Sequence, residues 1–136
     1  MTAEEWLEVS RERALDAGVI LSLRPDSIGS VYLAGYVIEC SLKAFLQAAG
    51  KKVPTSGSAG HNLVGLWKAT GLQKSILGGS EGSRTFFLEQ WSTAMRYSVN
   101  EDLNGQSPED LIDGAKLITG WFHQQVRRRR QYRRRR

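Results

Sequence analysis

The stretch AMRYSVNEDLN, residues 94–104, holds the side chains best suited to acting on an anion. Arg96 offers a planar fork of N–H donors that matches a phosphate or a carboxylate, and Tyr97 offers a ring that can stack on a base or simply pack. Glu101 can exchange a proton, but it stands beside Asp102 and so brings negative charge close to any polyanion. The stretch has no histidine, cysteine or lysine. By itself, Arg96 can hold an anion but cannot transfer protons.

A second pair of charged residues, Glu39 and Lys43, lies in the most apolar part of the chain. An unpaired carboxylate there would be costly, and Lys43 follows at the favourable helical spacing for an ion pair. Arg96 is the alternative partner of Glu39. We therefore expect Glu39 and Lys43 to act as polar support, either by fixing helix register or by orienting Arg96 toward a ligand.

The single cysteine and the two histidines do not form a metal-binding pattern. Cys40, His61 and His123 are widely separated, so we expect no metal and no cofactor. His61 is most simply a polar residue at a helix start, and it is the other candidate for proton transfer if it approaches Arg96. One cysteine, an acidic start (MTAEEWLEVS) and no long uninterrupted apolar stretch lead us to expect a cytoplasmic protein without a membrane segment.

The positive charge of the chain is concentrated in its last ten residues, RRRRQYRRRR, which hold eight of its 19 basic residues. Without them, 11 basic and 14 acidic residues remain, a net charge of −3. We expect a disordered tail that binds RNA or another polyanion through counterion release; a helix continuing from Val126 and a merely solubilising appendage are the alternatives. The tail residues assigned to this binding are Arg127, Arg128, Arg129, Arg130, Arg133, Arg134, Arg135 and Arg136.

Helical spacing of apolar residues predicts an all-α fold, an up-and-down bundle of four to five helices over residues 1–126, followed by the tail 127–136. Thr2 and Glu5 have the spacing of a capping box, Gly18 permits a stop, and Pro25 marks a boundary. The expected helices begin at Thr2 and cover 26–49, 61–71, 83–97 and a last segment from Ser107, with Arg96 at the end of the fourth. Gly50 has the place of a left-handed residue after the second helix, and Ser107 is the expected cap of the last one.

Three segments together resemble the HEPN superfamily: VYLAGYVIECSLKAFL, then GHNLVGLW, then FLEQWSTAMRYS. The likeness runs from about residue 6 to residue 123. HEPN proteins are small helical bundles of prokaryotic toxin–antitoxin and defence systems, often encoded beside minimal nucleotidyltransferases. The resemblance implies a homodimer formed through the helices that bear Tyr36 and Arg96, and a nucleotidyltransferase as a partner.

Active HEPN ribonucleases carry an arginine followed four to six residues later by a histidine, and they cleave RNA without a metal. Arg96 matches the arginine, but the window after it holds Asn100, Glu101 and Asp102. This departure favours a non-catalytic partner protein that binds a nucleic acid or a nucleotide. The alternatives are an active endoribonuclease toxin that uses Arg96 with Glu101 or His61, and a structural adaptor without affinity for nucleic acid.

Overall fold

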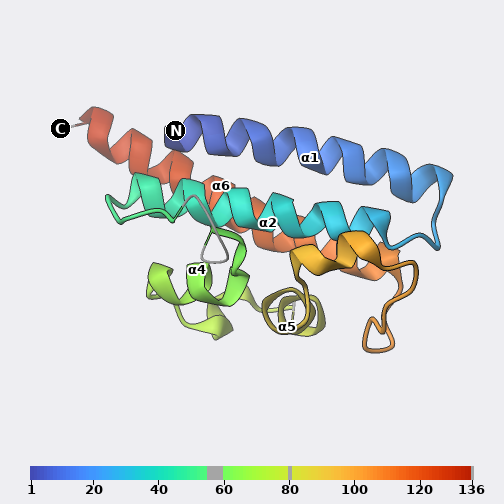
Figure 1. The fold of residues 1–136 in the computed structure, drawn as a ribbon. Coiled ribbons are helices and arrows are strands. Elements are labelled where there is room, and N and C mark those ends of the chain that lie inside the picture. Colours follow the sequence, from blue (N-terminus) through green and yellow to red (C-terminus); the bar gives the residue numbers. More distant parts are fainter. Residues whose placement is uncertain (55–59, 80, 136) are drawn as a thin grey trace.

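The computed structural model describes residues 1–54, 60–79 and 81–135, with side chains in the last helix as far as Arg129. Within these residues there are five α-helices, two 3-10 helices and no strand, so the predicted all-α bundle is confirmed (Figure 1). Among the described helices, none combines the length and the apolarity that crossing a membrane requires.

The first helix, α1 (Ala3–Leu23), begins with the predicted capping box. The Glu5 N–H donates to Thr2 Oγ1 at 3.1 Å, and the Thr2 N–H donates to the Glu5 carboxylate at 3.2 Å. The helix continues through Gly18, where the sequence permitted a stop, as far as the boundary predicted at Pro25. It ends at Arg24, whose backbone leaves the helical region because Pro25 follows.

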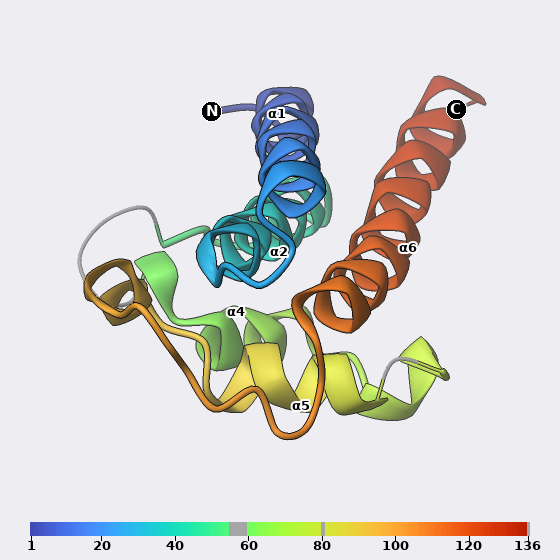
Figure 2. The ribbon, with the colours of Figure 1, turned by 90° about the vertical axis from the view of Figure 1, so that its right-hand side faces the viewer.

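The second helix, α2 (Gly29–Ala48), is the centre of the bundle, because α1, α4, α6 and η2 all contact it. It starts three residues later and ends one residue earlier than predicted, and Gly50 has the predicted left-handed conformation at φ 72°. The N–H groups of Gly50 and Lys51 donate to the carbonyls of Gln47 and Leu46, which satisfies the last turn. Figure 2 shows α1 and α6 diverging on two sides of α2.

Short elements cover the opposite side of α2 from α1 (Figures 1 and 2). They are α4 (Leu63–Thr70), η1 (Lys74–Leu77), α5 (Glu81–Glu89) and η2 (Thr93–Tyr97). The side chain of Asn62 caps α4 by accepting from the Gly65 N–H at 3.1 Å. The helix therefore starts after His61, and this residue stands in the connection just before it.

The helix predicted over residues 83–97 is interrupted, because α5 ends at Glu89 and η2 begins only at Thr93. Between them Trp91 lies directly on Gly35 of α2, where a Cβ atom would overlap the indole ring. The indole N–H of Trp91 donates to the carbonyl of Tyr32 at 3.1 Å. Arg96 is consequently presented by a short 3-10 helix beside α2, not by the end of a longer α-helix.

The last helix, α6 (Pro108–Arg135), begins at the predicted serine cap. The Asp110 N–H donates to Ser107 Oγ, and the Ser107 N–H donates back to the Asp110 carboxylate, both at 3.1 Å. The backbone stays helical through the arginine run to Arg135, so the disordered tail is not what the structure shows. Cations at a carboxyl-terminal helix end suit the helix dipole. Arg136 and the side chains of Arg130, Arg133, Arg134 and Arg135 lie outside the described part.

A polar cluster joins the three long helices inside the bundle. Ser10 of α1 and Ser41 of α2 lie 2.9 Å apart, and Nε2 of His123 on α6 lies 3.2 Å from both hydroxyl oxygens. Burial, assisted by Arg11 and Arg127, lowers the pKa of His123 to about 4. His123 is therefore neutral near pH 7 and acts as a structural link.

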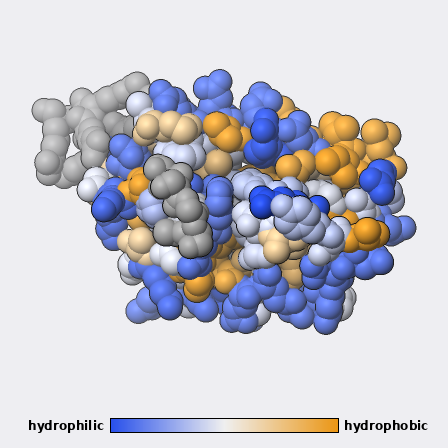
Figure 3. All heavy atoms as spheres, viewed as in Figure 1, coloured by the Kyte–Doolittle hydropathy of each residue, from blue (hydrophilic) through white to orange (hydrophobic). Residues whose placement is uncertain are grey.

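An apolar stripe follows the outer face of α1. Leu15, Val19 and Leu23 stand one helical turn apart and are all exposed. The space-filling view shows apolar residues gathered over the carboxyl end of this helix (Figure 3).

Gly35→Ala should destabilise the protein, because the added methyl group has to displace the indole of Trp91. We expect the free energy of unfolding to fall by about 1–3 kcal/mol in urea denaturation followed by tryptophan fluorescence. Gly18→Ala is the matched control, since nothing lies within 4 Å of a Cβ at this helical glycine. The control should gain about 0.5–1 kcal/mol. Equal effects at the two positions would show that Trp91 does not constrain Gly35.

Candidate functional site

The carboxylate of Glu39 is buried in α2 and is satisfied by two partners. Lys43 Nζ donates to Oε2 at 3.1 Å, and Nδ1 of His61 lies 2.7 Å from Oε1. Lys43, only 2% exposed, also sits over the Trp6 ring, 4.8 Å from its centroid. Of the partners that the sequence left open for Glu39, the structure has Lys43, while Arg96 makes no ion pair with it among the described residues.

Glu39 fixes the orientation of the His61 ring. A carboxylate can only accept a hydrogen bond. Nδ1 of His61 therefore carries the hydrogen and donates a hydrogen bond to the Glu39 carboxylate. Nε2, on the other side of the ring, is then left to accept a proton or, once protonated, to donate one. The ring also packs edge-on against Tyr36, with centroids 5.9 Å apart. His61 is therefore held at one nitrogen while its side chain stays 43% exposed.

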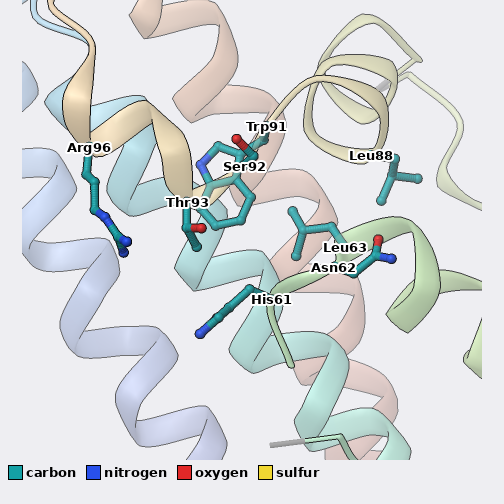
Figure 4. A pocket seen from close by; sticks show the side chains of 8 residues that line it. All are labelled: His61, Asn62, Leu63, Leu88, Trp91, Ser92, Thr93 and Arg96. Atoms are coloured by element: carbon teal, nitrogen blue, oxygen red, sulfur yellow. The ribbon is translucent and has the colours of Figure 1, made fainter. Parts of the chain in front are cut away.

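A cavity of about 580 Å³ opens where the start of α4, the end of α5 and η2 meet. Among the described residues that line it, the ionisable ones are His61 and Arg96, whose side chains reach toward the same open space past Thr93 (Figure 4). The polar side chains of Asn62 and Ser92 already accept from backbone N–H groups. The remaining lining residues are Leu63, Leu88 and Trp91.

Arg96 lines this cavity, and no carboxylate among the described residues forms an ion pair with it. The neighbouring hydroxyls of Tyr97 and Tyr32 raise its pKa, so the guanidinium stays charged at any physiological pH. Its Cζ atom lies 4.9 Å from the ring centroid of Tyr97. Tyr97 is 80% exposed, so of the two roles that the sequence left open for it, packing into the bundle is not the one that the structure shows. An exposed aromatic ring beside a free guanidinium is an arrangement suited to a nucleobase and its phosphate.

Glu101, the other candidate for proton transfer, lies outside the cavity. Its carboxylate accepts from Ser98 Oγ at 3.0 Å within the loop after η2. The described arginines of the tail, Arg127, Arg128 and Arg129, do not line the cavity either; Arg129 lies over the ring of Phe45 at 5.1 Å. The structure thus brings together Arg96 and His61, and it leaves the remaining candidates elsewhere.

Tyr36 supports the site without titrating in it. Its hydroxyl is 3.0 Å from that of Tyr32, and its ring packs against Trp91 with centroids 5.3 Å apart. Burial raises the pKa of Tyr36 far above its ordinary value, so the phenol remains protonated. Among the described residues, no group of three or more histidine, cysteine, aspartate or glutamate side chains is placed to hold a metal ion.

The sequence indicated Arg96, Glu39 and His61 as candidates, including an approach of His61 to Arg96, but it did not predict the bond between His61 and Glu39. The ribonuclease motif has its histidine shortly after the arginine, whereas this imidazole comes from the segment just before α4. One signal was available: a buried carboxylate has more acceptor sites than Lys43 alone can fill. A nearby polar residue of unassigned role, such as the histidine of GHNL, is then a candidate for the second partner.

Comparisons with models of protein families, with curated proteins and with solved structures find no match for this chain.

Glu39→Gln should destabilise the protein strongly, because it leaves the ammonium of Lys43 buried without a counter-charge. We expect a loss of about 3–5 kcal/mol in the free energy of unfolding. Glu8→Gln, on the exposed face of α1, is the matched control and should change it by less than about 0.5 kcal/mol.

The double variant Glu39→Gln/Lys43→Met separates loss of the ion pair from loss of shape. It should recover much of the stability, since an apolar side chain replaces the unpaired ammonium. In the same variant, ¹⁵N NMR of the imidazole should show that His61 no longer holds its proton mainly at Nδ1. An unchanged tautomer would show that Glu39 does not orient the ring.

Proposed function

We propose that this protein binds a phosphate group of single-stranded RNA or of a nucleotide in the cavity between His61 and Arg96. The observation that carries the proposal is that one cavity of about 580 Å³ is lined by Arg96, which has no ion pair within the described part of the chain, and by an imidazole anchored to a buried carboxylate. An arginine fork and an imidazolium are both donors to phosphate oxygens, and such charge-assisted bonds are among the stronger ones in proteins.

The charge distribution supports an anionic ligand at this place. The chain without its arginine run carries a net charge of −3, so Arg96 is a local positive site on a mildly acidic body. The exposed ring of Tyr97 gives a base a stacking surface next to the phosphate. Binding by the arginine run would add a tether that is independent of sequence and weakened by salt.

The wider setting of the proposal rests on the resemblance. In it the chain is a HEPN-like, non-catalytic partner in a cytoplasmic toxin–antitoxin or defence module. It forms a homodimer and associates with a minimal nucleotidyltransferase. Binding of a phosphate in the cavity requires neither of these partners, because Arg96 and His61 belong to one chain.

Arg96→Ala should weaken binding of a labelled six-nucleotide RNA by about 10- to 100-fold, because it removes the charge-assisted bonds to phosphate. Fluorescence anisotropy across a range of salt concentrations measures both the affinity and its salt slope, which should fall by about one. Arg11→Ala removes a cation that lies near His123, away from the cavity, and retains the arginine run. Equal weakening in the two variants would assign the binding to overall charge and defeat the proposal.

A second candidate function is metal-independent cleavage of RNA, and the Glu39–His61 pair is the observation that favours it. Nε2 of His61 can remove the proton of a ribose 2′-hydroxyl while the oxygen attacks the adjacent phosphate. A 2′,3′-cyclic phosphate forms as the bond from phosphorus to the 5′-oxygen of the next nucleotide breaks, and this oxygen leaves as a hydroxyl after taking a proton from water or from the protonated imidazole. Arg96 would then stabilise the negative charge that develops on the phosphate oxygens. Here the proton-transfer group comes from the loop before α4 instead of from the residues after Arg96.

If the chain cleaves, RNA should be cut in the presence of a chelator, and His61→Gln should lower the rate by about 10²–10⁴-fold. Gel analysis of a longer single-stranded RNA measures this, with His123→Gln as the control because that histidine is neutral and links the three long helices. RNA that stays intact with the unaltered protein would exclude this second function and leave the binding function in place.

A further inference from the structure

A second cavity lies on the other side of Arg96. It has a volume of about 340 Å³ and opens at the amino end of α2. Arg96 lines both cavities, so the two share this residue. The second cavity is also lined by Arg24, Ser27, Ile28 and Tyr32.

Arg24 is brought to this cavity by the backbone. Pro25 keeps Arg24 out of the helical conformation, and the chain turns back there to start α2. Arg24 is exposed and forms no ion pair in the described residues with any carboxylate. Asp26, the acid nearest in sequence, does not line the cavity. Among the described residues, the charged lining of this cavity is therefore two arginines and no acid.

The cavity also meets the partially positive end of a long helix. Ile28, at the N-cap of α2, provides no side-chain hydrogen bond to the first turn, and Ser27 Oγ accepts only from the Gly29 N–H. The unpaired N–H groups of such a first turn favour a negative charge. These N–H groups add to the positive electrostatic potential that Arg24 and Arg96 create in the cavity. The two arginines are sufficient to make the cavity a site for an anion.

We propose that the cavity between Arg24 and Arg96 is a second phosphate subsite, which takes the neighbouring phosphate of the same single-stranded RNA. This inference rests on the proposed function, because Arg96 is shared by the two subsites. A guanidinium has five N–H donors, so one arginine can contact two successive phosphates. Arg24 then supplies the second cation for the second phosphate.

A nucleic-acid strand fits these observations better than an acidic peptide does. Phosphates follow one another along a single backbone, and the two cavities follow one another past Arg96. Next to Arg96 the exposed ring of Tyr97 can stack on a base, for which a run of acidic residues has no counterpart. Unpaired strands leave their bases free to stack in this way.

The test compares a ligand with one phosphate, uridine 5′-monophosphate, and a ligand with two, 5′-phosphorylated uridylyl-uridine. NMR shift titrations of the full chain give both affinities. We expect the second phosphate to tighten binding by about tenfold or more. Arg24→Ala should abolish that gain and change monophosphate affinity by less than about twofold. Arg24→Lys should keep part of the gain, and Arg24→Glu should lower dinucleotide affinity further.

The outcomes separate this inference from the proposed function. If Arg96→Ala weakens both ligands while Arg24→Ala weakens neither, the second subsite is refuted and the phosphate cavity stands. Equal weakening of both ligands by Arg24→Ala also refutes it, since Arg24 would then act through overall charge or through the fold. If the unaltered protein binds neither ligand, the proposed function fails too. Displacement of the dinucleotide by hexaglutamate, dependent on Arg24, would reassign the surface to an acidic protein.

Discussion

The site depends on the hydrogen bonds that Lys43 and His61 make to the buried carboxylate of Glu39. This carboxylate lies in the most apolar helix, where a lone negative charge would be prohibitively costly, and it is tolerated because Lys43 and His61 both bond to it. The same two bonds perform separate tasks. Lys43 compensates the charge within α2, whereas His61 ties the loop before α4 to the centre of the bundle and exposes its second ring nitrogen.

A second constraint, the contact of Trp91 with Gly35, positions the other half of the site. Trp91 stacks over Tyr32 and packs edge-on against Tyr36, and its indole bonds the backbone of α2. Helix α5 ends before Trp91, which makes this contact, and the 3-10 helix η2 that carries Arg96 begins after it. Both His61 and Trp91 are bonded to α2. Since Arg96 follows Trp91 on η2, α2 thereby fixes where the imidazole and the guanidinium lie relative to one another.

The sequence was most informative where a local signal is sufficient. The capping box at Thr2, the left-handed Gly50 and the cap at Ser107 each depend on a few neighbouring residues, and each was predicted. The break after Glu89 was not, because Phe87, Leu88 and Trp91 have spacings that suit an unbroken helix equally well. Only the close approach to Gly35, a contact between distant segments, decides against it.

The functional residues divide in the same way. Arg96 and Glu39 were found by type and surroundings, but the partnership of Glu39 with His61 requires the fold. From the sequence, Arg24 is only the residue before the helix boundary at Pro25. Its position on a cavity with Arg96 follows from the turn into α2. When a residue acts through a contact with a distant segment, its neighbours in the sequence do not indicate that role.

The most direct test of the account is a crystal structure of the full chain with uridine 5′-monophosphate. The account predicts the phosphate between the guanidinium of Arg96 and Nε2 of His61, with Nδ1 of His61 still bonded to Glu39. A phosphate bound only along the arginine run, or an imidazole turned away from Glu39 in the complex, would contradict it.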